Sequence, residues 1–296
     1  MERDARVSSD VPPCIAHGAN LAPVCQSEIV LECVVNVSEG RDHKLLSAFD
    51  AACGGDLLDR HTDRDHHRSV FTLVGEDSVR ALTTLAVERL NLNDHEGAHP
   101  RLGVIDVVPF VPLADSSFDD AIRARDEFAH WLARTHGVPS FLYGPERTLP
   151  EIRRHAWTSL SPDAGPHDPH PTAGAVSVGV RDQLVAYNCW LETGTSLDSA
   201  REIARRVRQP GIRALGLAVN DRVQVSMNLI SPFVIGPADA VRAVDDVCHE
   251  VGCVIEHNEL VGLLSERVLR DIPRSKWRWL DVSEERTIEH RLARRG

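Results

Sequence analysis

The sequence lacks any apolar run that approaches the roughly 20 residues of a membrane-spanning helix. Its opening residues, Met1 to Arg6, mix both charges and precede no continuous apolar block, so we expect no secretory signal and a cytoplasmic location. The 296 residues are 42% hydrophobic and 26% charged, which is typical of a globular protein of about two domains.

Paired cysteines and an excess of basic residues are also missing. The seven cysteines are an odd number and include no C-x-x-C pair, which is typical of reduced thiols. Lys and Arg number 33 against 44 Asp and Glu, giving a formal net charge of −11 without a long basic run. We therefore expect no general affinity for nucleic acid or for an anionic membrane.

The order of the apolar runs predicts an α/β (α+β) fold of two β-α-β-β-α-β halves. In the first half we expect strands at 29–37, 57–58, 69–74, 104–110 and 139–143, and helices at 38–53 (capped by Ser38), 76–92 and 116–135. In the second half we expect strands at 184–191, 214–219, 223–229 and 253–257, and helices at 197–208 and 237–250. Such halves suggest ferredoxin-like subdomains with mixed sheets, helices on the outer faces and a ligand groove between them.

These elements divide the chain into four parts. We expect a loosely ordered extension at 1–28, an N-terminal subdomain at 29–175, a C-terminal subdomain at 176–270 and a tail at 271–296. The Pro- and His-rich stretch 161–174 is typical of a linker. A mixed-charge helix at 283–295 would pack the tail on the body or on a second subunit.

The stretch from His95 to His99 spells H-E-x-x-H, which on a helix would hold zinc with Glu96 as the base. Gly97 and Pro100 weaken and break such a helix, so we predict no metal, and the zinc hydrolase alternative stays open to test. Pro100 restricts His99 to an extended conformation, which displays its imidazole for acid–base chemistry. His95 is expected only to face water.

Two further segments concentrate polar residues at strand ends. The stretch 59–68 is interpreted either as an active-site loop or as a solvated, self-paired charged loop. After the histidine motif, Arg101 is a candidate anion clamp, and Asp106 either orients an imidazole or pairs within the sheet. The glycines and prolines of 165–174 fit a plain linker, or a backbone that a flat ligand can approach closely.

Eight segments in constant order resemble the formiminotransferase family, which moves a formimino group from N-formiminoglutamate to tetrahydrofolate. The matching segments are 31–40, 57–59 with 68–75, 97–106, 141–144, 165–174, 185–188, 224–229 and 259–262. The segment 97–106, Gly-Ala-His-Pro-Arg-Leu-Gly-Val-Ile-Asp, resembles the signature around the family's catalytic histidine, which falls on His99.

The resemblance implies a homodimeric, folate-binding transferase of one-carbon and histidine metabolism, with tetrahydrofolate as co-substrate and no metal. His99 would be the general acid and base. Substrate-binding or orienting roles fall to Asp59, His61, Arg68, Arg101 and Asp106. Folate binding falls to Gly165, Pro166, His167, Asp168, Pro169, His170, Pro171, Thr172, Ala173 and Gly174.

The chain departs from the family pattern at two places. The segment 151–157 replaces an Arg-x-Gly-Glu-aromatic element, and Glu96 stands where folate-using relatives often have Lys. Two alternatives therefore stay beside the main hypothesis, namely formimidoyl transfer to a different amine and a non-catalytic folate-binding paralogue.

Overall fold

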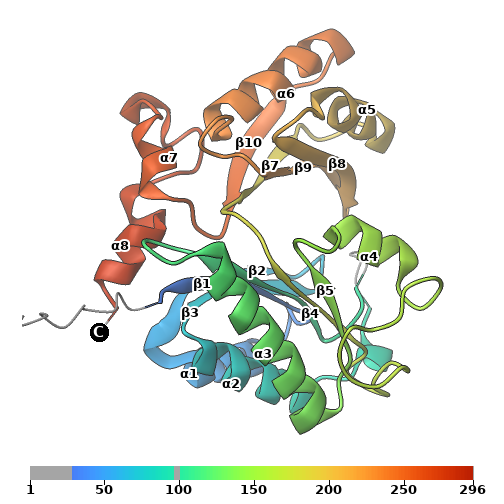
Figure 1. Cartoon of the computed structure of the whole chain (residues 1–296). Helices are drawn as coiled ribbons and strands as arrows, with labels where there is room; N and C mark the ends of the chain where they lie inside the picture. Colours follow the sequence, from blue (N-terminus) through green and yellow to red (C-terminus); the bar gives the residue numbers. More distant parts are fainter. Residues whose placement is uncertain (1–28, 97–100, 296) are drawn as a thin grey trace, which may run out of the picture.

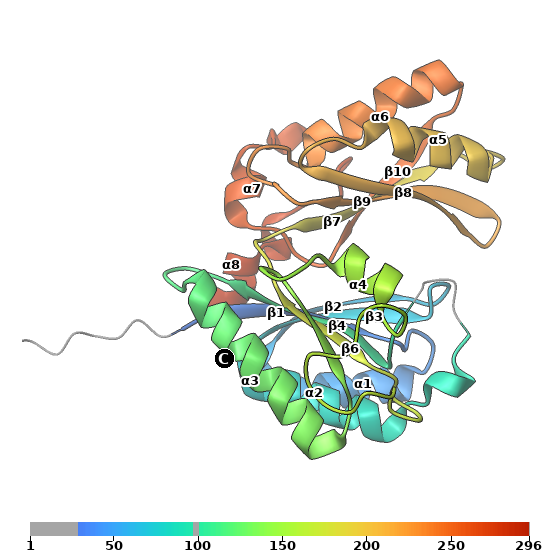
Figure 2. The same ribbon diagram turned by 45° about the vertical axis from the view of Figure 1, so that its right-hand side comes forward.

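The computed structural model describes residues 29–96 and 101–295, which form two sheets whose helix-poor inner faces oppose each other (Figures 1 and 2). The first sheet has the strand order β2 (Leu57–Asp63), β3 (Arg68–Val74), β1 (Leu31–Val37), β4 (Ile105–Pro112), β6 (Val176–Val180) and β5 (Ser140–Tyr143). The second has the order β10 (Ile255–Val261), β7 (Val185–Leu191), β9 (Arg222–Leu229) and β8 (Ile212–Val219). The predicted two-subdomain α+β fold is confirmed.

The first sheet is covered on its outer face by α1 (His43–Cys53), α2 (Glu76–Arg89) and α3 (Phe118–His136) (Figure 2). Helix α3 shows why these segments fold as they do. Ala121, Ala124, Phe128 and Leu132 recur at helical spacing and are buried in the core, so one stripe of the helix faces the sheet. Ser117 and Asp120 form a capping box at its start.

The second sheet is antiparallel throughout and carries α5 (Leu197–Val207) and α6 (Pro237–Val251) on its outer face. Alternation along β7 sends Tyr187 and Cys189 into the core beneath these helices. The intervening Asn188 and Trp190 are therefore on the inner face, towards the first sheet. In this way each sheet buries one apolar face and leaves polar side chains between the subdomains.

Helix α4 (Leu149–His155) is the exception, because it lies on the inner side of the first sheet (Figure 2). Its Ile152 is buried against Val107, Phe141 and Tyr143. Neither this helix nor β6 was expected from the sequence. Two other predictions were wrong in detail: β2 continues through residue 63 where a loop from 59 was expected, and α1 is capped by Asp42 instead of Ser38.

The stretch 161–174 is not an interdomain linker. It packs on the first subdomain, where Ser140 N donates to Ala164 O (2.9 Å) and Val104 N donates to Ala173 O (3.0 Å). Strand β6 follows at once and pairs in parallel with β4 and β5, so the predicted boundary at 175 falls before the last strand of the first sheet. The chain crosses to the second subdomain in residues 181–184.

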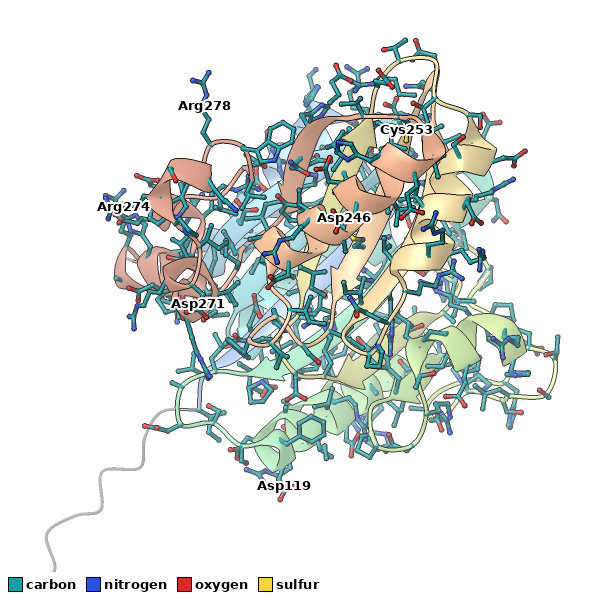
Figure 3. The ribbon with its side chains drawn as sticks, turned by 90° about the horizontal axis from the view of Figure 1, so that it is seen from above. Asp119, Asp246, Cys253, Asp271, Arg274 and Arg278 are labelled. Atoms are coloured by element: carbon teal, nitrogen blue, oxygen red, sulfur yellow. The ribbon has the colours of Figure 1, made fainter. Side chains whose placement is uncertain are left out.

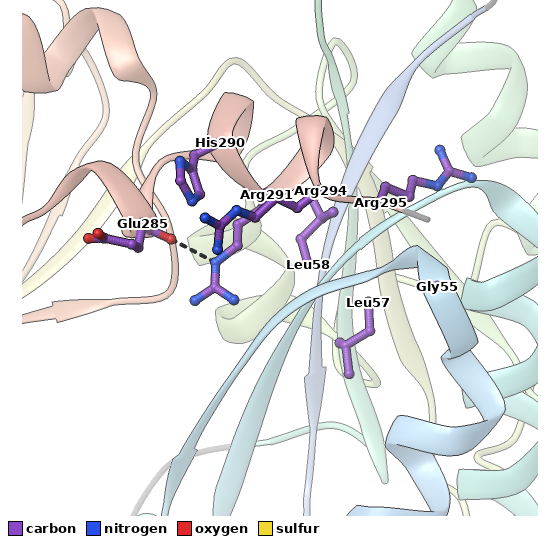
Figure 4. A pocket seen from close by; sticks show the side chains of 8 residues that line it. All are labelled: Gly55, Leu57, Leu58, Glu285, His290, Arg291, Arg294 and Arg295. Carbon is purple, nitrogen blue, oxygen red and sulfur yellow. Dashed lines mark hydrogen bonds between the residues drawn. The ribbon is translucent and has the colours of Figure 1, made fainter.

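The tail packs on the body of the same chain. It follows α7 (Glu266–Arg270), and α8 (Ile288–Ala293) is shorter than the helix predicted at 283–295. Leu280 and Val282 enter the core of the second subdomain, whereas Ile288 packs with Leu58, Val74 and Leu113 of the first and with Leu263 of the second. A cavity of about 370 Å³ lies between the tail and β2 (Figure 4). Exposed tail side chains such as Asp271, Arg274 and Arg278 point outward (Figure 3).

The described helices include none that is both long and apolar enough to cross a membrane. The predicted extension at 1–28 lies outside the described residues.

Candidate functional site

The hairpin turn between β2 and β3 presents the first functional side chain, His67. Asp63 Oδ1 accepts the N–H groups of Asp65 (2.8 Å) and His66 (2.9 Å), which tightens the turn. His67 then adopts a left-handed backbone with φ of 48°. Arg101 stabilises this conformation by donating to His66 O (3.1 Å) and His67 O (3.3 Å). The turn is therefore held in place by Arg101, which belongs to the segment 97–106.

Four residues meet here and are called the His67 cluster: Glu39, His67, His95 and Arg101. His67 Nε2 lies 3.2 Å from Glu39 Oε1, and His67 Nδ1 lies 2.8 Å from His95 Nε2. Arg101 also contacts the His95 ring. Glu39 follows β1 and reaches His67 because the β1–β3 register, which pairs Val37 with Ser69, continues to this point.

The two imidazoles of the His67 cluster are uncharged at neutral pH. Burial lowers the pKa of His67 to about 4, and the neighbouring His95 and Arg41 lower it further than Glu39 raises it. Burial likewise lowers the pKa of His95. Neutral imidazoles can each donate one hydrogen bond and accept another, so the cluster can relay or fix a proton without adding positive charge.

The prediction that His95 faces water was wrong. Its ring is half-buried, and its Nδ1 is enclosed without a hydrogen-bond partner in residues 29–96 and 101–295. Glu39 and His67 were not identified as site residues from the sequence. The signal that could have found them is the strand register, since two antiparallel strands that start and end together place the residues beyond their ends side by side.

Asp106 organises a second group of charges beneath the histidine motif. It is the extra residue of a β-bulge, because Asn36 pairs with Val107 whereas Val37 pairs with Ile105. Asp106 is only 2% exposed. Its Oδ1 accepts the N–H of Leu102 (2.8 Å) and a bond from Arg153 Nη1 (2.7 Å), and its Oδ2 accepts from Arg153 Nη2.

Arg68 and Arg101 lie within electrostatic range of this pair. Burial lowers the pKa of Arg68 and of Arg101; in both residues Asp106 opposes this lowering and Arg153 adds to it. We call Arg68, Arg101 and Arg153 around Asp106 the arginine cluster. Asp63 also acts on Arg68, so three guanidinium groups stand among two carboxylates, an arrangement that suits an anionic ligand.

Asp59 and His61 belong to the charged stretch 59–68 and were predicted to bind or orient the substrate. Their side chains contact residues outside the His67 cluster and the arginine cluster. Asp59 Oδ1 lies 3.6 Å from Arg291 of the tail, outside the His67 cluster. His61 Nε2 lies 3.3 Å from Glu259 Oε1 on β10, so it bridges the two sheets. Glu259 Oε2 also accepts from Asn188 (3.0 Å) and Trp190 (2.8 Å). Burial alone would raise the pKa of Glu259, but these hydrogen bonds lower it to about 2.

The predicted folate segment 165–174 lies along the first subdomain. Gly165 packs against Ala133, Val138 and Pro139 at the junction of α3 and β5, and 165–169 is exposed. The far end of the segment reaches the histidine motif, where Gly174 lies opposite Gly103. His99 itself lies outside the described residues. In the part of the chain that is described, no three or more His, Cys, Asp or Glu side chains are arranged to hold a metal ion.

Comparison with known proteins places this arrangement in a family. The family model described as formiminotransferase domain, N-terminal subdomain, matches residues 30–181. Glutamate formimidoyltransferase of Streptococcus pyogenes serotype M1 is 32% identical over 274 residues, which cover 82% of this chain and 91% of that protein. The protein of the same name from Thermoplasma acidophilum is 30% identical, with 82% of this chain and 90% of that protein covered.

Formimidoyltransferase-cyclodeaminase of Sus scrofa is 30% identical, and the match covers 82% of this chain but only 51% of that protein.

Among solved structures, the periplasmic protease PqqL of Escherichia coli aligns at 11% identity over 91% of this chain and 38% of that one. Its TM-score of 0.23 is too low to bear on the fold. The family and relative matches identify an enzyme of the transferase class. The chain belongs to the formiminotransferase family.

Proposed function

We propose that this enzyme transfers a formimino group from N-formimino-L-glutamate to tetrahydrofolate. Family membership and relatives named glutamate formimidoyltransferase support this reaction. The observation that carries it is the arginine cluster, because the donor has two carboxylates and the cluster brings three guanidinium groups together. Guanidinium groups bind carboxylates through paired hydrogen bonds, which fixes orientation as well as charge.

In the proposed mechanism His99 acts as general base and then as general acid. A nitrogen of tetrahydrofolate attacks the amidine carbon of the donor and passes its proton to the His99 imidazole. The resulting tetrahedral intermediate breaks its bond to the glutamate nitrogen, which takes the proton back from His99 as it leaves. The proton count balances, and the products are formimino-tetrahydrofolate and glutamate. Fixing both substrates in line supplies much of the remaining acceleration.

The acceptor is proposed to bind between the inner faces of the two sheets, with 165–174 on its pterin side. The polar residues that alternation leaves on these faces, such as Asn188 and Glu259, are consistent with a ligand of many hydrogen-bonding groups. We further propose that the enzyme acts as a homodimer in the cytoplasm. Light scattering of the purified protein tests the dimer.

The decisive experiment incubates wild-type enzyme and His99→Ala with formiminoglutamate and tetrahydrofolate. It follows formimino-tetrahydrofolate, which is read by absorbance after acid has converted it to methenyl-tetrahydrofolate with loss of ammonia. His249→Ala is the matched control, because that side chain is 76% exposed on α6. We expect turnover by the wild type and the control and a loss of at least about a hundredfold in His99→Ala. No wild-type turnover would overturn the substrate pair, and replacing tetrahydrofolate by other amines would then identify a different acceptor.

A further inference from the structure

Trp157 combines two unfavourable features at one position. Its backbone is left-handed, with φ of 67°, a conformation that a bulky side chain rarely adopts. Its side chain is also exposed to 38%, although tryptophan is on average highly buried. Glycine would fill the same position without backbone strain. Strain of this kind concentrates at ligand-binding sites.

The loop that follows α4 holds Trp157 in this conformation. His155 O accepts the N–H groups of Thr158 (3.0 Å), Ser159 (3.1 Å) and Leu160 (3.0 Å). Trp157 N donates to Leu160 O (3.1 Å), which closes the loop on itself. These hydrogen bonds help to offset the strain, so the backbone fixes where the indole ring stands.

The ring of Trp157 lies on the inner side of the first sheet, where α4 also lies (Figure 2). It packs on Phe141 of β5, with the ring centroids 5.0 Å apart and an angle of 84° between the planes. Phe141 is fully buried, together with Ile152 of α4 and with Ala175. Ala175 directly follows the segment 165–174. The exposed ring and the end of the predicted folate segment therefore adjoin one patch of the inner face.

The strand register relates this patch to the arginine cluster. Phe141 pairs with Ser177 of β6, which pairs in turn with Val107 of β4. Val107 directly follows Asp106. Neighbouring strands lie about 4.8 Å apart, so Phe141 is roughly 10 Å from the strand that carries Asp106. A flat ligand stacked on Trp157 would therefore lie near the proposed donor site.

We propose that the indole of Trp157 stacks on the flat bicyclic ring of the amine acceptor and thereby selects acceptors that carry such a ring. The inference rests on the proposed function, because it takes tetrahydrofolate as the source of the ring. Stacking on an aromatic side chain needs no charged partner. It accounts for an apolar ring that is exposed and held in a strained conformation. It also gives the pterin a contact that is independent of the glutamate end of folate.

Two ligands distinguish contact with the pterin ring from contact with the rest of the acceptor. Folic acid contains the ring, whereas p-aminobenzoyl-L-glutamate has the remainder of the molecule without it. Calorimetry of the wild type should show folic acid binding about five- to a hundredfold more tightly, as expected for one stacked ring. Equal affinities would overturn the inference, and so would a failure of folic acid to bind.

Trp157→Gly tests the residue itself, because it removes the ring and relieves the strain at the same time. We expect it to reduce the preference for folic acid at least about fivefold while binding p-aminobenzoyl-L-glutamate within about threefold of wild type. Trp157→Asn is a second variant without the ring, since Asn also tolerates a left-handed backbone. Trp157→Phe keeps a flat ring and should retain most of the preference. Trp279→Gly is the matched control, because Trp279 is an exposed tryptophan of the tail.

The outcomes separate this inference from the proposed function. A Trp157→Gly protein that keeps the preference overturns the stacking contact even if the wild type turns over. A preference that depends on Trp157 in a wild-type protein without transfer activity supports the contact and overturns the proposed reaction. If Trp157→Gly changes the molar mass in light scattering and leaves the preference intact, the ring is a contact between copies of the chain and the inference fails.

Discussion

His61 of β2 and Glu259 of β10 contact each other between the two sheets, with His61 Nε2 3.3 Å from Glu259 Oε1. The pair joins residues about two hundred positions apart in the chain, and the same carboxylate binds Asn188 and Trp190 of β7. Because both strands contribute inner-face side chains, the contact holds the polar faces of the subdomains at a fixed separation. Acid weakens these contacts, because the lowered pKa of Glu259 shows that they stabilise its charged carboxylate, and protonation removes that charge.

Glu259→Gln should reduce stability at neutral pH and weaken its dependence on acid. The folded pKa of about 2 lies below the ordinary value of 4.5, so this contribution is complete above pH 4.5 and is lost as the pH falls towards 2. We expect a loss of about 1–3 kcal/mol at pH 7 that diminishes at pH 4 and below, measured by urea unfolding. Glu256→Gln is the control, because Glu256 is exposed and pairs only at the surface with Arg222. A variant whose deficit is the same at pH 7 and pH 3 would contradict the assignment.

His67→Gln should alter a different part of the pH profile. The folded pKa of His67 is about 4, below its ordinary value of 6.5, so the unfolded chain binds the extra proton first as the pH falls. Wild-type stability should therefore rise as the pH increases from 4 to 6.5, by on the order of 1 kcal/mol from this residue, since water reaches part of the ring. His67→Gln should flatten the curve of unfolding free energy in that window. The exposed His249→Gln control should leave the slope as in wild type.

Arg153→Lys should weaken donor binding more than it slows chemistry. Lysine keeps the charge beside Asp106 but loses the two-pronged contact that Arg153 makes with both carboxylate oxygens. We expect KM for formiminoglutamate to rise about tenfold with kcat changed less than about threefold. Arg154→Lys on the next, exposed position of α4 should behave as wild type. An unchanged KM in Arg153→Lys would remove this residue from the donor site.

Ile288→Ala should destabilise the docking of the tail. Ile288 is 4% exposed and packs with Leu58, Val74, Leu113 and Leu263, which come from both subdomains. Truncation leaves a cavity among these side chains, and a loss of about 2–4 kcal/mol is expected in urea unfolding. Val234→Ala, at a side chain that is 79% exposed, provides the control and should change stability by less than about 0.5 kcal/mol. A loss for Ile288→Ala no larger than that of the control would show that the tail contributes little.

Much of the fold could be predicted from periodicity because most elements carry a strong apolar pattern. Helix α3 and strand β1 are examples, since each buries one regular face. Strand β6 was missed because its five residues follow a Gly- and Pro-rich segment, and α4 was missed because Arg153, Arg154 and His155 conceal its single buried residue, Ile152. Short elements of this kind are specified by their packing partners more than by their own sequence.

The candidate site was predictable only in part. Arg68, Arg101 and Asp106 were identified and do gather, whereas Arg153 joins them through a helix that the sequence did not predict. The pairing of Glu39 with His67 depends on the register between β1 and β3, and no short sequence motif predicts that register. The proposed roles of His99 and of 165–174 stay predictions. The predicted extension at 1–28 and the predicted start of the tail at 271 also stay predictions.

The tail also restricts how the two subdomains can move. The chain passes from the first subdomain to the second in residues 181–184, and it returns to the first when Ile288 docks on β2 and β3 and Arg295 pairs with Asp56. Two bodies joined by two chain connections rotate most easily about the line through them, and the contact of His61 with Glu259 must break for the sheets to separate. Any widening between the sheets is therefore greatest at the rim furthest from that axis, so a bulky co-substrate would enter and leave from that side.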